Sequence, residues 1–315
     1  IAREELGIVH RLAQKMASAA HTDLLISATT SQKEAVHGAD YVLTSFREGD
    51  FEARHLDECI PLEFGVIGQE TIGPGGFFFA MRTLPVIRSL LEDMRNLAPD
   101  AVLVNYTNPT QIVAEAVTHF SDIPCISICD QSKDDVRHVL HALEMPDADV
   151  ELVSVGLNHA TWSTHFLIEG EDGVEVMRRH HDAVLARGDV SNRVKRQFSL
   201  AAAYDRLPNS YMQYYYYREE TLVEALAVPK TRAEVILEQL PGYYRHFREQ
   251  AAADEPQLEH VRGGSIFGDM AVDVIMSLIL DDGQVHTLNI PNRGALAGFS
   301  ADRVVEIPGV VSGNT

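Results

Sequence analysis

Short runs of consecutive apolar residues, separated by segments with helical spacing, constrain the fold of this chain more than any other feature. The runs at residues 101–105 and 125–129 each precede such a segment, at 109–118 and 132–143. Strands that are buried on both faces read as continuous apolar runs, and helices between them cover the two faces of a parallel sheet. The first half of the chain is therefore predicted to be a doubly wound α/β domain.

The same criteria predict the remaining elements. In the first half they predict further strands at 24–28 and 39–45, and helices at 3–19, 32–37 and 77–97. In the second half they predict helices at 172–204, 220–252 and 264–280, and strands at 151–155, 285–290 and 303–307. We expect a Rossmann-like domain over residues 1–150 and a C-terminal α+β substrate domain over residues 151–315.

The sequence carries no GxGxxG dinucleotide fingerprint. Gly73-Pro74-Gly75-Gly76 is rich in glycine, but no predicted strand precedes it, so it lacks the context of a phosphate-binding loop. The chain starts without Met, as if inside a helix, and stops abruptly after a strand-like run. From these features we expect the N-terminal strand and its glycine-rich loop to be missing, together with a C-terminal segment.

The chain is acidic, with a formal net charge of −20 and an isoelectric point near 5.0. Nucleic acids and anionic membranes both select basic surfaces, so neither is an expected partner. An anionic substrate would need a local cluster of arginine or lysine. The three cysteines are too few for a disulfide framework and favour a reducing compartment, hence a cytoplasmic location. No run of apolar residues is long enough to span a membrane.

Polar residues with chemical potential follow two of the predicted strands. One strand ends in the segment Asn105-Tyr106-Thr107-Asn108-Pro109, and another in Cys129-Asp130-Gln131. His159 follows a third strand-like run, after a break at residues 156–158. Ligands of doubly wound sheets bind at the carboxyl ends of the strands. A thiolate and an imidazole suit a divalent metal, and a pair of them leaves positions open for a substrate. By itself, however, Cys129 is more typical of a small buried hydrophobe.

Other candidate residues allow two interpretations. Asp130 precedes a predicted helix, so N-capping and catalysis are about equally expected. Tyr211 stands apart from the tyrosine run at 214–217, which is most simply strand or helix core. A neighbouring divalent cation would lower the pKa of a tyrosine and make it a usable base. Arg82 and Arg232 are either ordinary surface arginines or part of a site for an anionic sugar.

Four motifs together resemble one enzyme family. They are Ile67-Gly68-Gln69-Glu70-Thr71-Ile72-Gly73-Pro74-Gly75-Gly76-Phe77, Asn105-Tyr106-Thr107-Asn108-Pro109, Cys129-Asp130 and Gly156-Leu157-Asn158-His159. In this order they resemble glycoside hydrolase family 4, which includes 6-phospho-α- and 6-phospho-β-glucosidases and requires NAD. The resemblance extends over essentially the whole chain.

The resemblance implies a role for each candidate residue. It places a divalent metal, usually manganese, on Cys129 and His159. It makes Asp130 the general acid and Tyr211 the general base, with Tyr214 as the alternative base. It assigns sugar binding to Arg82 and Asn108, and the substrate phosphate to Arg232. Ser45 and Asn105, at the ends of two predicted strands, are expected to contact NAD.

The family mechanism is also implied. NAD⁺ takes hydride from C3 of the sugar, and the metal polarises the resulting ketone. Tyr211 then removes the C2 proton, the leaving group at C1 departs by elimination with help from Asp130, and water adds. NADH finally returns the hydride, so the cofactor is regenerated in each turnover. A small-molecule sugar is the expected partner, and the family resemblance implies a homodimer or homotetramer.

The subfamily stays open at this stage. Asp130 is typical of α-type enzymes, whereas residues 262–264 and 292–296 resemble the β-type, and Gln131 departs from both. One alternative is a family member that acts on unphosphorylated or uronic-acid glycosides. A second is a plain NAD-dependent 2-hydroxy acid dehydrogenase of the malate or lactate type. A third is a non-catalytic relative that binds sugar or nucleotide.

Overall fold

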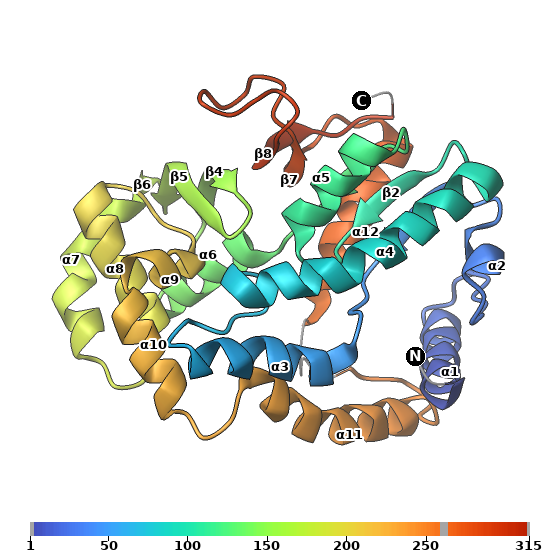
Figure 1. The fold of residues 1–315 in the computed structure, drawn as a ribbon, viewed down its shortest axis with the longest axis horizontal. Helices are drawn as coiled ribbons and strands as arrows, with labels where there is room; N and C mark the ends of the chain where they lie inside the picture. The colour runs from blue at the N-terminus through green and yellow to red at the C-terminus, as the bar shows by residue number, and fades with distance from the viewer. Residues whose placement is uncertain (1–2, 259–263, 314–315) are drawn as a thin grey trace.

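A computed structural model of the chain describes residues 3–258 and 264–313. Its strands form one eight-stranded sheet in the order β1-β2-β3-β7-β8-β4-β5-β6. Figure 1 shows the fold as a ribbon. The strands are β1 (Tyr41–Thr44), β2 (Val102–Asn105), β3 (Cys125–Ser127), β4 (Val150–Leu157), β5 (Ala160–Ile168), β6 (Glu171–Asp172), β7 (Val285–Pro291) and β8 (Val304–Val310).

The sheet has a parallel part and an antiparallel part. Strands β1, β2 and β3 pair in parallel, which confirms the parallel sheet predicted for the first half of the chain. The β7–β8 hairpin joins the two parts. Ser127 of β3 pairs with Asn289 of β7, and Glu306 of β8 pairs with Gly156 of β4, each as a single antiparallel partner pair.

Helices cover both faces of the parallel strands. The helices of the first half are α1 (Arg3–Ala19), α2 (Gln32–Val36), α3 (Asp50–Glu63), α4 (Gly73–Leu97), α5 (Thr110–Phe120) and α6 (Gln131–Ala142). Those of the second half are α7 (Gly173–Ala186), α8 (Asn192–Tyr204), the 3-10 turn η1 (Ser210–Met212), α9 (Gln213–Tyr216), α10 (Arg218–Ala227), α11 (Arg232–Gln250) and α12 (Gly264–Leu280).

Successive residues of β2 point into different cores, as strand geometry requires. Leu103 packs with Ile87 of α4 and Val113 of α5 on one face. Val104 packs with residues of α12, including Val274, on the other face. This arrangement, with helices on both faces, is the predicted doubly wound architecture.

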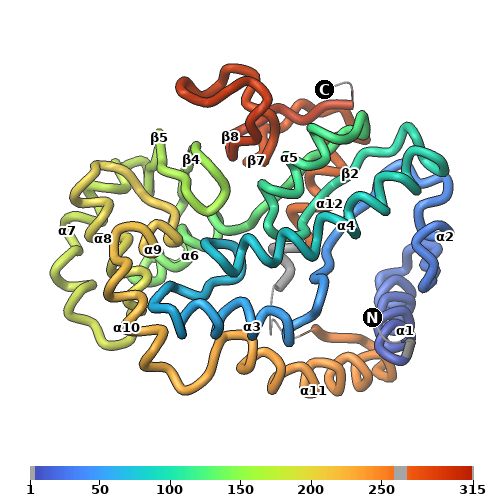
Figure 2. Tube along the Cα trace, viewed as in Figure 1, coloured from blue at the N-terminus to red at the C-terminus, as the bar shows by residue number. Residues whose placement is uncertain are grey.

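Helix α11 returns along the first half of the chain. It runs beside α3, and its far end approaches α1 (Figure 2). Arg248 of α11 forms an ion pair with Glu4 of α1. Residues far apart in sequence thus form one helical layer away from the sheet. Among the helices of the described residues, none combines the length and the apolar character needed to cross a membrane.

The strand predicted at residues 24–28 is wrong. This segment has no regular secondary structure, and Leu25 is fully exposed while Leu24 is 69% exposed. A strand needs a neighbour that supplies backbone partners. Within the described residues β1 pairs only with β2, so no strand next to β1 offers partners to residues 24–28.

The two long helices predicted in the second half are each interrupted. The break between α7 and α8 contains Gly188, and the break between α10 and α11 contains Pro229, whose ring disfavours a helical residue before it. Ser191 and Thr231 then cap the new helices through hydrogen bonds from backbone N–H groups. Helix α3 and strand β5 were not among the predicted elements.

The glycine-rich segment serves close packing. Helix α4 begins at Gly73, and a Cβ atom at Gly75 would lie 2.2 Å from the backbone oxygen of Gln69 and 2.9 Å from that of Asp57. Only glycine allows the start of α4 to approach these two carbonyl groups so closely.

We therefore expect Gly75→Ala to lower the free energy of unfolding by about 1–3 kcal/mol, because two backbone segments would have to move. Gly242→Ala is the matched control, since a Cβ atom there meets nothing within 4 Å. Alanine should stabilise that helical position by about 0.5–1 kcal/mol. Urea denaturation measures both variants; equal stability of the two would contradict the packing role of Gly75.

Candidate active site

The carboxyl ends of the parallel strands form one polar edge. Thr44, Asn105 and Ser127 are register partners at the last positions of β1, β2 and β3. Ser45, Asn108 and Cys129 lie one to three residues beyond them along the chain. The residues that the sequence placed at strand ends therefore lie along a common edge of the sheet.

Cys129 and His159 meet at this edge. The Cys129 Sγ atom lies 3.5 Å from Nε2 of His159. Cys129 follows β3, whereas His159 lies in the tight turn between β4 and β5, where Leu157 pairs with Ala160. The two predicted metal ligands, which are distant in the order of the sheet strands, are thus brought into contact.

The His159 ring is buried and oriented. Its Nδ1 atom lies 3.0 Å from Oγ1 of Thr71, so Nε2 is the nitrogen that faces Cys129. Burial lowers the pKa of His159 to about 4, and the imidazole is therefore neutral near pH 7. A neutral imidazole whose other nitrogen is held by a hydrogen bond is the usual form of a metal ligand. Thr71 lies within the first of the four motifs, but no role was predicted for it from the sequence.

The donor set of this pair fits a divalent metal. Burial raises the pKa of the Cys129 thiol, so it keeps its proton unless a nearby cation stabilises the thiolate. In the part of the chain that the structure describes, no third His, Cys, Asp or Glu gathers with these two residues into a metal-binding group. A sulfur and a nitrogen ligand with open positions suit a borderline metal that also binds its substrate.

Tyr211 stacks directly on His159. The ring centroids are 4.1 Å apart and the planes make an angle of 19°. Tyr214 contacts the Tyr211 ring edge-on, and the two ring centroids are 5.8 Å apart. Burial and the negative charge of Glu70 raise the pKa of Tyr211, whereas the guanidinium of Arg193 acts in the opposite direction. The phenol therefore keeps its proton unless further positive charge is close.

Arg193 connects Tyr211 to a buried carboxylate. Its Cζ atom lies 5.6 Å from the Tyr211 ring centroid, and its Nε and Nη2 atoms donate to Ser210 Oγ at 2.7 Å and Asp135 Oδ1 at 3.0 Å. Asp135 also accepts from the backbone N–H of Ser210 at 2.8 Å. These bonds hold the η1 turn that presents Tyr211. Arg193 and Asp135 were not predicted from the sequence, because neither lies in a recognisable local motif.

Asp130 does not cap the helix that follows it. It occupies the N-cap position of α6, but its side chain makes no capping hydrogen bond. Burial raises the pKa of Asp130, and the nearby Asp134 adds to this effect. A carboxyl group that tends to hold its proton suits a general acid. Of the two interpretations of Asp130, capping is the one that the structure disfavours.

A cluster of charged side chains, made of Glu70, Arg47 and Arg54, lies close to His159 and Tyr211. Glu70, next to Thr71, forms ion pairs with Arg47 and with Arg54, the latter at 2.9 Å. Burial alone would raise the pKa of Glu70, but the two arginines outweigh it and hold that pKa below its usual range. The group therefore places a largely buried negative charge close to the imidazole and the phenol, and no role for Glu70 was predicted from the sequence.

The predicted sugar ligands lie on α4 and at the start of α5. Arg82 forms an ion pair with the buried Asp57, while its Nε atom is buried without a hydrogen-bond partner. Asn108 accepts hydrogen bonds from the backbone N–H and the hydroxyl of Thr110. Their contacts with a sugar stay predictions.

The two predicted cofactor ligands differ in exposure. Ser45 is exposed directly after β1. Asn105 is fully buried; it accepts from the Thr44 hydroxyl at 2.7 Å and donates to Ser127 Oγ at 3.0 Å and to the Thr107 carbonyl. The Asn105 side chain thus ties the strand ends together, and its contact with NAD stays a prediction.

Arg232 begins α11 and is exposed, where it lines a surface depression with α11 residues such as Glu238 and Tyr243. Its role at a phosphate stays a prediction.

Tyr215 and Tyr216 are exposed, at 59% and 44%, so the expected core role of the tyrosine run is wrong for these two. Of the β-type segment at 262–264, residues 262 and 263 lie outside the described residues.

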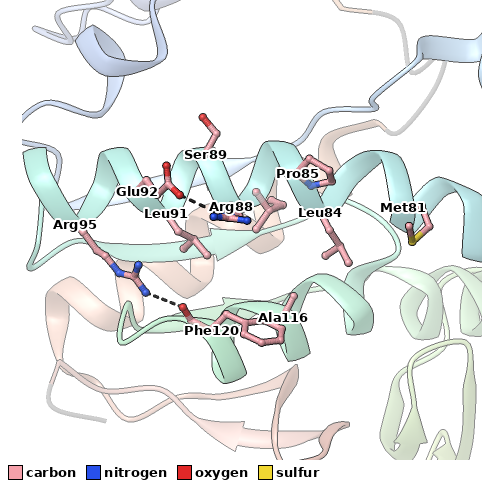
Figure 3. A pocket seen from close by; sticks show the side chains of 11 residues that line it. Met81, Leu84, Pro85, Arg88, Ser89, Leu91, Glu92, Arg95, Ala116 and Phe120 are labelled. Atoms are coloured by element: carbon pink, nitrogen blue, oxygen red, sulfur yellow. Dashed lines mark hydrogen bonds and ion pairs between the residues drawn. The ribbon is translucent and has the colours of Figure 1, made fainter.

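A larger hollow lies away from this chemistry. It is a groove of about 890 Å³ between α4 and α5 (Figure 3). Its lining is mainly apolar, including Leu84, Leu91 and Phe120, with Arg88 and Glu92 as an ion pair on α4. None of the candidate site residues lines it. The chemistry of the chain is therefore concentrated at the strand ends rather than in this groove.

Comparison with known protein families matches both halves of the chain to the same family. The model for the family 4 glycosyl hydrolases matches residues 1–145, and the model for the C-terminal domain of that family matches residues 154–315. A probable 6-phospho-β-glucosidase of Bacillus subtilis is 34% identical over 96% of this chain and 70% of its own length.

Solved structures agree. The 6-phospho-β-glucosidase of Thermotoga maritima with manganese, NAD⁺ and glucose-6-phosphate superposes with a TM-score of 0.82 and 27% identity, over 100% of this chain and 73% of that one. A 6-phospho-α-glucosidase from gut microorganisms with NAD and Mn²⁺ gives a TM-score of 0.83 and 28% identity, over 99% and 74%.

The burial of His159 predicts how stability depends on pH in metal-free protein. The unfolded chain protonates His159 below pH 6.5, whereas the folded protein keeps it neutral until about pH 4. The unfolded state binds more protons in this window, so the free energy of unfolding falls as pH falls. His159 should account for a loss of about 2 kcal/mol between pH 7 and pH 5.

Urea denaturation in the presence of a chelator measures this loss, and His159→Gln should make it smaller. His138 is the matched control, because a hydrogen bond to Asp134 raises its pKa instead. His138 therefore stabilises the fold at low pH, and His138→Gln should make the loss steeper. An unchanged loss in His159→Gln would show that His159 is not held neutral.

Proposed function

Because the chain belongs to glycosyl hydrolase family 4, we propose that it hydrolyses 6-phospho-glucosides with the help of NAD and a divalent metal ion, usually Mn²⁺. The observation that carries this proposal is the assembly of Cys129, His159 and Tyr211. The sulfur and imidazole nitrogen are 3.5 Å apart, and the phenol ring stacks on the imidazole.

The names of similar proteins support the substrate class. They include 6-phospho-β-glucosidases of Escherichia coli and Thermotoga maritima and a 6-phospho-α-glucosidase of Leptotrichia buccalis. Both anomers occur among them, so they support a 6-phospho-glucoside without selecting its anomer. Similar structures that contain NAD, Mn²⁺ and glucose-6-phosphate support both cofactors.

Cys129 and His159 would hold the metal, and Ser45 and Asn105 lie where the strand ends would meet NAD. When bound, these groups supply reversible hydride transfer at a sugar carbon and Lewis-acid polarisation of sugar oxygens. The protein contributes orientation: Thr71 fixes the ring of His159, and the arginines around Glu70 fix the charge behind it.

Tyr211 moves the first proton. Its Oη atom would accept the proton from C2 of the sugar, because a cation held next to it lowers the pKa that burial raises. The guanidinium of Arg193, 5.6 Å from the ring centroid, would stabilise the phenolate that accepts this proton and becomes a neutral phenol. Tyr214 lies edge-on to this ring and is the alternative base.

Asp130 moves the second proton. Its raised pKa keeps the carboxyl protonated more readily than an exposed aspartate, so it would donate to the oxygen of the leaving group. Arg82 and Asn108 would bind sugar hydroxyls, and Arg232 would bind the phosphate. In a chain with a net charge of −20, such basic side chains are needed to hold an anionic substrate.

The dehydrogenase alternative has weaker support. A lactate dehydrogenase of Eimeria maxima has a TM-score of 0.51 and 13% identity to this chain, which is a likeness of fold alone. A plain hydride transfer would leave the Cys129 thiol beside His159 without a function. The glycosidase uses every residue of the assembly.

We also propose that the enzyme forms a homodimer or homotetramer and works in the cytoplasm. Large apolar side chains on α4, such as Phe77, Phe78 and Met81, are between 56% and 59% exposed. Exposed apolar surfaces of this kind are typical of subunit contacts. The three free cysteines suit a reducing compartment.

Cys129→Ser should abolish hydrolysis of a 6-phospho-glucoside and weaken Mn²⁺ binding, because a hydroxyl is a far poorer ligand than a thiolate for a borderline metal. Cys59→Ser is the control, since Cys59 lies on α3 outside the Cys129–His159 pair. Metal content and hydrolysis rate are measured for both. Full activity and metal content in Cys129→Ser would remove the metal assignment.

Paired p-nitrophenyl glucosides with and without a 6-phosphate test the substrate class. We expect kcat/KM to be about 10–100-fold higher for the phosphorylated member, the range that one or two charge-assisted hydrogen bonds provide. NADH should not accumulate, because the hydride returns to the sugar. Equal rates for both members would favour the unphosphorylated-sugar alternative, and net NADH formation would favour the dehydrogenase.

A further inference from the structure

A row of buried polar side chains crosses the sheet behind the site. Its members are register partners on neighbouring strands, and the row reaches β4 at Gly156: Thr44, Asn105, Ser127, Asn289 and Glu306. Each of the five is at most 6% exposed. The proposed mechanism gives no role to Glu306, the only carboxyl group among these five.

Glu306 is surrounded by neutral donors. Its Oε2 atom accepts from Asn158 Nδ2 at 2.7 Å and from Asn289 Nδ2 at 3.1 Å. Its Oε1 atom lies 3.4 Å from the hydroxyl of Ser132. Within residues 3–258 and 264–313 no basic side chain forms an ion pair with it. A buried carboxyl group without a cation is costly compared with an apolar side chain, so its contribution lies in what it holds.

The residue that it holds precedes the metal ligand. Asn158 and His159 form a two-residue turn, and His159 has a φ of 62°, a left-handed conformation that costs a non-glycine residue about 1 kcal/mol or more. Such a turn keeps its shape only when the surrounding structure determines it.

Two hydrogen bonds anchor this turn to β8. The side chain of Asn158 donates to Glu306, and its backbone N–H donates to Oε1 of Gln111 at 3.0 Å. Gln111 in turn donates to the carbonyl of Val304 at 3.1 Å. Both anchors end on the same strand, two residues apart.

We propose that Glu306 is a positioning residue, which holds Asn158 and thereby keeps His159 in place opposite Cys129. This inference rests on the proposed function, because it concerns the geometry of the same metal site. Glu306 forms no hydrogen bond to either ligand; it acts through Asn158, which precedes His159 and whose side chain also forms a hydrogen bond with the Cys129 thiol.

Mn²⁺ binding to the purified full chain, followed by electron paramagnetic resonance, tests this role without substrate. Glu306→Met keeps the length of the side chain but removes the acceptor. We expect it to raise the Kd for Mn²⁺ by about 10–100-fold, as loss of a group that orients a metal ligand does. Glu306→Gln keeps one acceptor oxygen for Asn158 and should fall between wild type and Glu306→Met.

Glu115→Met is the matched control. Glu115 binds the same hairpin, through Arg303 at 2.8 Å and the backbone N–H of Val304 at 3.1 Å, but it does not contact the turn. The Glu115→Met variant should have a lower melting temperature but an unchanged Kd for Mn²⁺. If Glu306→Met and Glu115→Met both lower the melting temperature and neither changes the Kd, Glu306 is merely structural and the proposal is overturned.

Asn158→Ala removes the same hydrogen bond from its other end, so it replaces Glu306→Met should that variant fail to fold. A raised Kd supports the proposal, and an unchanged Kd overturns it. Wild-type protein that binds no Mn²⁺ would instead overturn the proposed function, and this inference with it. Wild-type binding that both variants leave unchanged would overturn the inference alone.

Discussion

Among the residues that the structure describes, the two parts of the sheet meet only through the β7–β8 hairpin, and the candidate site depends on that junction. Single partner pairs join Ser127 to Asn289 and Glu306 to Gly156, so the hairpin sets the spacing between the end of β3 and the β4–β5 turn. Cys129 lies just beyond the first of these pairs and His159 just beyond the second. Their 3.5 Å contact is therefore a consequence of strand order rather than of local sequence.

Burial gives the site a definite electrostatic state. Burial raises the pKa values of Cys129 and Tyr211, and it lowers that of His159. All three groups are thus neutral without a cation, while Glu70 stays charged because Arg54 and Arg47 hold its pKa down. A divalent ion next to the sulfur would favour the thiolate and the phenolate together. On the proposed function, metal binding and activation of Tyr211 as the base would therefore be one event.

Much of the fold and part of the candidate site could be predicted from the sequence, because the spacing of apolar residues and the polar residues at strand ends are local signals. The apolar runs predicted β2 and β3, and the strand-end rule placed Cys129, Asn105 and Asn108 at one edge. The strand prediction for residues 24–28 was wrong because an apolar run does not show whether a partner strand exists. Arg193 and Glu306 could not be found, because each reaches the site from an element whose position is set by distant pairings.

The junction also determines when the site can form. Residues 125–129 and 150–159 are made early, but the strands that bring them together span residues 285–310. Contacts of such large separation along the chain form slowly, and domains synthesised from the N-terminus must wait for them. During synthesis a growing chain would hold Cys129 and His159 on two unconnected sheet fragments. On the proposed function, Cys129 and His159 would form a metal site only after the β7–β8 hairpin has inserted between β3 and β4.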